Sequence, residues 1–291
     1  MGIDSVRTIG VVGAGQMGGG IAQVAVMADF SVVLHDSEKR ALVAALEAID
    51  KGLQRLVEKG GMAQADKGTA IRQVRTTTEL KDLAACDFVV EAVSERLPLK
   101  MQIFEALDAG CRPEVVLATN TSSLSITRIA AATRRPERVV GMHFMNPVPV
   151  MKLIEVVPGQ ATSRATTDDT VALALRMGKT PVLSQDLPGF ISNRVLMPMI
   201  NEAIFALYEG LGTRDDIDTV MTLGMRHPMG PLALADFIGL DTCLSILEIL
   251  QEGFGDPKYR PCPLLRRLVD AGHLGRKSGR GFYDYSQGAP R

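Results

Sequence analysis

The first half of the chain alternates short apolar runs with longer stretches of helical character. The apolar runs, rich in β-branched residues, lie at 7–13, 31–36, 87–93, 115–119 and 138–142. The stretch that follows the second run repeats its apolar residues on one helix face, at Leu42, Ala45, Ile49, Leu53 and Leu56. Short apolar runs that alternate with helices are typical of a parallel sheet covered on both faces. We therefore predict a doubly wound α/β fold.

The pattern changes near residue 186. Pro188-Gly189 interrupts the chain, and after it apolar residues recur every four positions from Ile191 to Leu207, as in a long helix that contains Pro198. Thr213 and Asp216 have the spacing of a capping box. Further helices are predicted at 231–251 and 263–271. We therefore expect two domains, an α/β domain over 1–186 and an all-α domain over 187–291.

Length and composition agree with a two-domain globular enzyme or binding protein. The chain has 291 residues, of which 46% are hydrophobic and 22% charged, and domains average roughly 150 residues. This composition excludes a disordered chain. The net charge of −1 implies no bulk attraction to nucleic acid or to an anionic membrane. An anionic ligand would need a local cluster of basic residues.

Targeting and redox signals point to the cytoplasm. No run of about 20 apolar residues predicts a membrane span, and the N-terminal residues lack the layout of a signal peptide. The four cysteines show no metal-ligand spacing, so no metal is expected. They are interpreted as small, reduced core residues: Cys86, Cys111, Cys243 and Cys262.

A glycine-rich motif follows the first predicted strand and opens a helix. Its sequence, GxGxxG, is Gly13-Ala14-Gly15-Gln16-Met17-Gly18. In this position it is typical of a Rossmann-like dinucleotide site, with the pyrophosphate at the helix N-terminus. Asp36, at the end of the second strand, can accept both ribose hydroxyls and would repel a 2′-phosphate. NAD is therefore favoured over NADP, although Lys39 and Arg40 lie close by in the sequence.

A histidine and a glutamate flank a proline-containing turn. His143 and Glu155 each lie six residues from Pro149, in the apolar segment 138–157. If the two flanking strands form an antiparallel hairpin at the end of the sheet, these side chains face one another. An imidazole backed by a carboxylate can take a proton from an alcohol. A structural core pair is the alternative interpretation.

Three basic residues follow one side of the predicted helix 38–59. Lys51, Arg55 and Lys59 are four residues apart. Such a face could hold the phosphates of an anionic ligand. A solvated basic face remains the alternative.

The motifs together resemble the L-3-hydroxyacyl-CoA dehydrogenase family over nearly the whole chain. The resemblance is carried by GAGQMGGGIAQ, FVVEAVSE, ATNTSSLSI, GMHFMNPVPVMKLIEVV, DLPGFISNRV, HPMGPLALADFIGLD and GRKSGRGFY. It implies an NAD-dependent oxidoreductase that converts a 3-hydroxyacyl-CoA to the 3-ketoacyl-CoA reversibly. It also implies a homodimer formed through the C-terminal domain.

The resemblance assigns roles to individual residues. It implies that His143 is the catalytic base, oriented by Glu155, and that Ser122 and Asn193 hold the substrate oxygen. It places the following residues on the cofactor in addition to the glycine loop and Asp36: Glu95, Lys100, Asn120, Asn146 and Lys277. It makes Arg55 and Lys59 contacts of CoA, and the four-residue spacing adds Lys51 to the predicted contacts. Without the resemblance, Lys100 would be interpreted as a solvated helix charge, Asn193 as a helix cap and Lys277 as a loop residue.

Two other functions remain open at this point. One is a dehydrogenase of a free hydroxy acid or sugar acid, of the L-gulonate or carnitine type, which needs no CoA contacts. The other is a non-enzymatic, crystallin-like structural role. The basic residues on helix 38–59 argue against the first alternative, and the intact set of polar residues around His143 argues against the second.

Overall fold

The structure is a computed structural model in which residues 2–286 are described. The chain divides into two compact units, Met1–Leu187 and Pro188–Arg291. Each unit has its own apolar core.

The first unit contains one eight-stranded sheet. Its strands are β1 (Thr8–Val12), β2 (Ser31–His35), β3 (Val74–Thr77), β4 (Phe88–Glu91), β5 (Val116–Thr119), β6 (Val139–Phe144), β7 (Leu153–Pro158) and β8 (Thr180–Leu183). The strand order is β3-β2-β1-β4-β5-β6-β7-β8. Neighbouring strands are parallel except β6 and β7, which are antiparallel. The prediction of a doubly wound, mainly parallel sheet with an antiparallel hairpin is confirmed.

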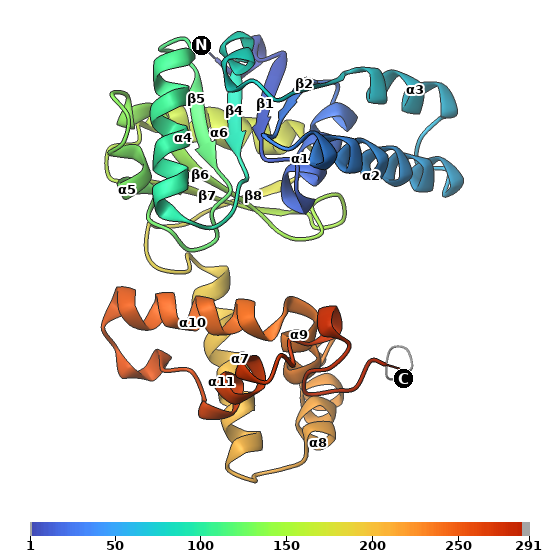
Figure 1. Ribbon diagram of the computed structural model, residues 1–291, viewed down its shortest axis with the longest axis vertical. Helices are drawn as coiled ribbons and strands as arrows, with labels where there is room; N and C mark the ends of the chain where they lie inside the picture. The colour runs from blue at the N-terminus through green and yellow to red at the C-terminus, as the bar shows by residue number, and fades with distance from the viewer. Residues whose placement is uncertain (1, 287–291) are drawn as a thin grey trace. The chain divides into compact units, whose positions relative to one another are not determined.

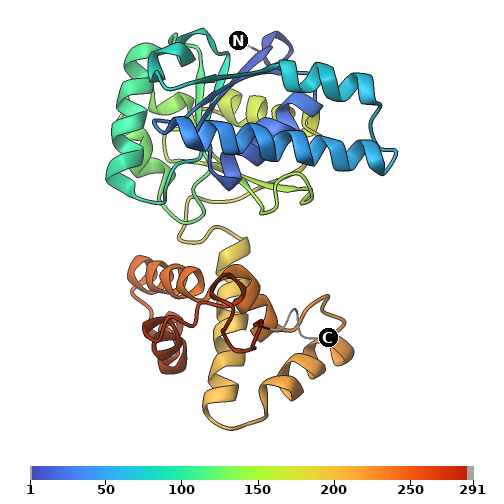
Figure 2. The same cartoon turned by 45° about the vertical axis from the view of Figure 1, so that its right-hand side comes forward.

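Helices cover both faces of this sheet (Figure 1). They are α1 (Gln16–Met27), α2 (Lys39–Glu58), α3 (Gln64–Arg72), α4 (Leu97–Gly110), α5 (Ile126–Ala130) and α6 (Arg164–Arg176). Helices α1, α2 and α6 contribute to the apolar core on one face, and α4 and α5 lie on the other. Helix α2 projects beyond the sheet with α3 beside it (Figures 1 and 2). The predicted apolar face of α2 is buried at Leu42, Ala45, Ile49 and Leu53.

The apolar pattern did not predict two of the strands. Both lie at the edges of the sheet: β3 is only partly buried, and three of the four residues of β8 are exposed. An edge strand contacts the core with few side chains, so it needs no continuous apolar run. Hydrophobic periodicity therefore predicts the centre of this sheet but not its edges.

The second unit is helical, as predicted. Its α-helices are α7 (Ser192–Tyr208), α8 (Arg214–Thr219), α9 (Pro231–Ile238), α10 (Leu240–Phe254) and α11 (Pro263–Asp270). The capping box of Thr213 and Asp216 is present at the start of α8. The helical region predicted over 231–251 consists of two helices, because Gly239, with φ of +103°, separates α9 from α10. A positive φ is accessible to glycine and ends the first helix.

Two further expectations concern the chain as a whole. All four cysteines are free thiols buried in the core, as predicted. Burial raises the pKa of Cys86 to about 12 and that of Cys243 to about 12, so both are unreactive thiols at neutral pH. Within residues 2–286, no helix has the length and apolar character needed to cross a membrane.

Candidate active site

His143 and Glu155 face one another across the β6–β7 pair. The strand register makes them direct partners, and Nδ1 of His143 lies 2.8 Å from Oε2 of Glu155. Both side chains are buried, with residue exposures of 8% and 1%. A carboxylate at this distance favours the tautomer in which Nδ1 carries the proton and Nε2 carries the lone pair. The predicted pairing is therefore present, and its geometry suits a general base.

The glycine loop has the geometry of a phosphate-binding turn. Gly13 has φ of +98°, and a Cβ on Gly18 would lie 1.7 Å from the Gly13 carbonyl oxygen, so this turn requires glycine at both positions. A Cβ on Gly15 would meet nothing within 4 Å. The backbone at Gly15 is therefore open to a ligand, as a pyrophosphate requires. Gln16 and Met17 form the first turn of α1 beside it.

A hollow of about 500 Å³ lies beside this loop, and Gly13, Gly15 and Asp36 line it. Asp36 is already fixed by backbone N–H groups: Oδ2 accepts from Ala14 at 2.7 Å and Oδ1 accepts from Glu38 at 2.9 Å. Each carboxylate oxygen has capacity for a second donor. The side chain can therefore receive ribose hydroxyls without giving up these bonds.

Glu95 organises the loop that carries Ser122. Its Oε1 accepts hydrogen bonds from the Ser122 N–H at 2.9 Å and from the hydroxyls of Thr121, Ser122 and Ser123 at 2.5, 3.3 and 3.2 Å. Burial alone would raise the pKa of Glu95, but the Lys100 ammonium and these hydrogen bonds outweigh burial and lower it. The Glu95 carboxyl is therefore ionised at neutral pH and accepts hydrogen bonds from the loop that carries Ser122.

Lys100 is not a solvated helix charge. Its exposure is 1%, and its ammonium lies 2.7 Å from Glu91 Oε1 and 3.4 Å from Glu95 Oε2. Glu91, fully buried at the end of β4, also accepts the Thr119 hydroxyl at 2.7 Å. The sequence motifs did not single out Glu91. The signal that could have found it is an acidic residue inside the apolar run 87–93, because a buried charge needs a partner.

Asn120 and Asn146 follow the carboxyl ends of β5 and β6. The side-chain oxygen of Asn120 accepts the Phe144 N–H at 2.8 Å, so this residue ties the two strand ends together. Asn146 lies in the turn between β6 and β7 and lines the groove described next. Both therefore lie at the carboxyl ends of the parallel strands, where β1 also leads into the glycine loop.

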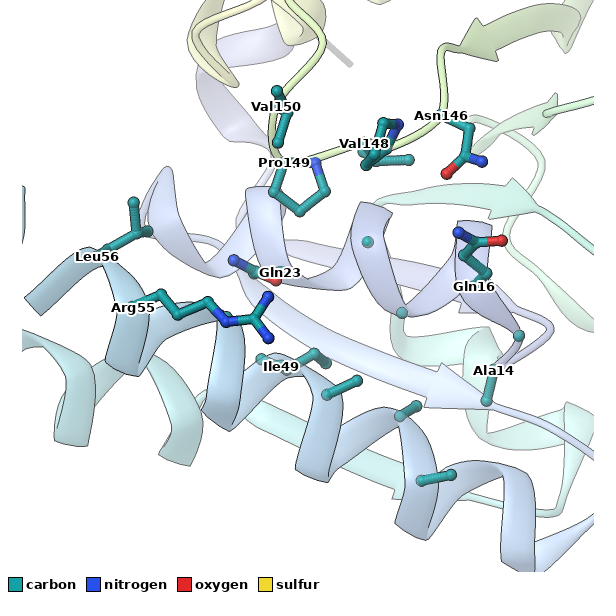
Figure 3. A pocket seen from close by; sticks show the side chains of 18 of the residues that line it. Ala14, Gln16, Gln23, Ile49, Arg55, Leu56, Asn146, Val148, Pro149 and Val150 are labelled. Atoms are coloured by element: carbon teal, nitrogen blue, oxygen red, sulfur yellow. The ribbon is translucent and has the colours of Figure 1, made fainter. Parts of the chain in front are cut away.

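A groove of about 810 Å³ runs between the glycine loop, α1, α2 and the β6–β7 turn. Figure 3 shows Arg55 extending from α2 toward α1, while Pro149 and Val150 lie along the opposite side. Arg55 and Lys59 both line the groove. Gly15 borders this groove as well as the hollow beside Asp36.

Lys51 does not line this groove. It borders a separate depression with Asp50 and Ile71, and its ammonium lies 4.0 Å from Glu47. Successive residues of a helix turn by about 100°, so Lys51 is rotated by about 80° from Lys59 around the α2 axis. A four-residue spacing therefore does not direct all three side chains into the same groove. Of the three residues expected to contact CoA, Arg55 and Lys59 line this groove and Lys51 lies outside it.

Two of the predicted site residues belong to the second unit. Asn193 is buried in the first turn of α7. Lys277 forms an ion pair with Asp241, at 2.5 and 2.7 Å from the two carboxylate oxygens. The sequence did not predict this partner, because Asp241 is distant along the chain.

Comparisons with known proteins assign the family. The model for the 3-hydroxyacyl-CoA dehydrogenase NAD binding domain matches residues 8–187, and the model for the C-terminal domain of these enzymes matches residues 189–285. The chain belongs to the 3-hydroxyacyl-CoA dehydrogenase family. It is an oxidoreductase that uses NAD, as the motifs predicted.

Named relatives extend over nearly the full chain. A probable 3-hydroxybutyryl-CoA dehydrogenase of Bacillus subtilis is 56% identical over 97% of this chain and 98% of its own length. A 3-hydroxybutyryl-CoA dehydrogenase of Bradyrhizobium diazoefficiens is 52% identical, with coverage of 98% and 97%. The crystal structure of (S)-3-hydroxybutyryl-CoA dehydrogenase from Ralstonia eutropha matches with a TM-score of 0.95 at 47% identity, covering 97% of this chain and all of that one.

Proposed function

We propose that this enzyme oxidises (S)-3-hydroxybutyryl-CoA to the 3-ketoacyl-CoA reversibly, with His143 as the general base. The buried His143–Glu155 pair is the observation that carries the proposal. It lies on the sheet whose strand β1 leads into the glycine loop. The matches to 3-hydroxybutyryl-CoA dehydrogenases support the substrate.

In the proposed reaction, His143 Nε2 accepts the proton of the substrate 3-hydroxyl, and Glu155 stabilises the imidazolium that forms. When bound, NAD would supply the hydride acceptor for C3. In the reverse direction the imidazolium returns its proton to the oxygen at C3. Ser122 holds that oxygen, where charge develops during the reaction, and the family resemblance assigns Asn193 the same role. Asp36 and the glycine loop hold the cofactor, and Glu95, Lys100, Asn120 and Asn146 support the cofactor side. The resemblance also assigns Lys277 to the cofactor.

Arg55 and Lys59 are proposed to bind the phosphates of CoA in the α1–α2 groove. Both cations line it, and the groove is large enough for an extended ligand. This feature favours a CoA thioester over a free hydroxy acid or sugar acid, which has no phosphate for these residues to bind.

The proposal is tested with the wild-type enzyme and His143→Gln. Wild type should oxidise NADH with acetoacetyl-CoA and not with acetoacetate alone, followed by absorbance at the NADH band. His143→Gln should lower kcat by about 10²- to 10⁴-fold, the usual contribution of a general base, while the NADH dissociation constant stays unchanged. Turnover of acetoacetate at the rate of the thioester would support the free-acid alternative. Activity of His143→Gln close to wild type would overturn the assigned base.

A further inference from the structure

Lys179, between α6 and β8, is a buried lysine with no role in the proposed reaction. Its exposure is 7%, and burial lowers its pKa. Its ammonium donates to the carbonyl oxygens of Val148 at 2.5 Å and Met151 at 2.7 Å. Among residues 2–286, no carboxylate forms an ion pair with it. Burying a cation without a counter-charge costs free energy. The two hydrogen bonds of the Lys179 ammonium offset part of this cost.

The two carbonyls belong to the 146–151 turn between β6 and β7. Within this turn, the N–H groups of Val150 and Met151 both donate to the Pro147 carbonyl, at 3.0 Å each. Val148, 2% exposed, packs against α1 so closely that a Cβ on Gly20 would lie 2.8 Å from the Val148 Cβ. The turn is therefore held both by its packing against α1 and by the Lys179 ammonium.

This turn is one wall of the groove. Asn146 through Val150 all line it, opposite Arg55 of α2 (Figure 3). The Lys179 ammonium binds two carbonyl oxygens of this turn and so fixes its shape. A positive charge beside the wall also favours an anion in the groove.

We propose that Lys179 is a positioning residue for the acyl-CoA groove, where its ammonium fixes the 146–151 turn in the shape that receives the CoA part of the substrate. The inference rests on the function proposed above. Both hydrogen bonds of the Lys179 ammonium go to the 146–151 turn, of which residues 146–150 line the groove, and neither goes to the His143–Glu155 pair. Its loss should therefore change substrate affinity more than the chemical step.

The test compares Lys179→Met with Lys179→Gln in the full-length enzyme. The methionine has a similar length and no donor, whereas glutamine keeps N–H donors and loses the charge. We expect the KM for acetoacetyl-CoA to rise by about tenfold or more in Lys179→Met, as two lost charge-assisted hydrogen bonds predict, and less in Lys179→Gln. The KM for NADH should rise less than the KM for acetoacetyl-CoA, because Asn146 alone of this turn supports the cofactor side, and kcat should change by less than about threefold. Lys152→Met, an exposed lysine next to the same turn, is the matched control and should behave as wild type.

Chemical rescue separates a positioning role from a general loss of stability. In Lys179→Ala, added n-propylammonium should restore the KM for acetoacetyl-CoA toward the wild-type value, while n-propanol should not. This arm decides the question if Lys179→Met does not fold. Absence of acetoacetyl-CoA reduction by wild type would reject the proposed function itself. With an active wild type, an unchanged KM in Lys179→Met, or equal losses for NADH and acetoacetyl-CoA without rescue, would overturn the inference.

Discussion

Glu91 and Lys100 form an ion pair that is almost completely removed from water. The pair is supported on both sides: Glu91 accepts the Val93 N–H and the Thr119 hydroxyl, and Lys100 also lies near Glu95. A buried pair of this kind is sensitive to the loss of one member, because the remaining charge has neither water nor a partner. Glu95, and through it the Ser122 loop, depends on the same lysine.

Lys100→Met should destabilise the fold by about 3–5 kcal/mol at neutral pH, the usual cost of leaving a buried charge unpaired. The loss should be smaller at pH 5 than at pH 8, because the Lys100 ammonium offsets the burial that raises the pKa of Glu95. Without that ammonium, protonation of Glu95 relieves the buried charge as pH falls. Denaturant unfolding at both pH values measures these effects.

The double variant Glu91→Gln/Lys100→Met provides the control. It removes both charges, so it should be more stable than Lys100→Met alone at pH 8. If the single variant were equally destabilised at both pH values, the loss would come from packing and not from the unpaired carboxylate.

Residue-scale predictions from the sequence succeeded where local geometry decides the outcome. The two-residue period of the strands and the turn between them bring His143 opposite Glu155. The partners of Lys51, Lys100 and Lys277 could not be predicted in this way. Sequence spacing gives the helix face of a charge, but its burial depends on what the fold packs against that face.

Helix α2 illustrates the same limit at the scale of an element. Its apolar face was predicted correctly and packs against the core. On its polar side, the groove reaches Arg55 and Lys59 but leaves out Lys51. Helix α2 therefore carries two candidate ligand contacts in the groove, and Lys51, outside the groove, is a matched control on the same helix.

Arg55→Ala/Lys59→Ala should raise the KM for acetoacetyl-CoA by about tenfold or more at low salt, because each cation would lose a charge-assisted contact with a phosphate. The difference from wild type should shrink as salt increases and screens the wild-type contacts. Steady-state kinetics at two ionic strengths provide the measurement.

Two comparisons make this experiment specific. Lys51→Ala changes the charge of the same helix and should leave the KM near the wild-type value. Acetoacetyl-pantetheine, which lacks the nucleotide of CoA, should not distinguish the double variant from wild type. A weakened KM for this truncated substrate would mean that the two residues act through the shape of the groove.

At the scale of the whole molecule, the second unit exposes several large apolar side chains. They include Val195 at 67%, Leu211 at 83%, Val220 at 57%, Leu223 at 80% and Met225 at 61% exposure. Most of them belong to the short segment 211–225, and exposed apolar side chains gathered in one segment are typical of an interface. This surface supports the proposed homodimer through residues 188–291, the interface that the family resemblance implies.

Light scattering should therefore give a mass near twice the 31.3 kDa of one chain at micromolar concentration. The mass should not change when salt is added, because an apolar interface does not depend on charge attractions that salt would screen. A mass of one chain at all concentrations would contradict the proposed dimer, and it would leave the chemistry proposed for the first unit unaffected.

Gly15 borders both hollows of the first unit. If NAD and acyl-CoA occupy them, two polyanions approach the same peptide segment, and each raises the electrostatic cost of binding the other. This coupling is thermodynamically reciprocal, so the penalty that the cofactor imposes on the thioester equals the penalty in the other direction. The shared glycine therefore links the occupancy of the two sites, and ionic strength sets how strongly each ligand favours release of the other.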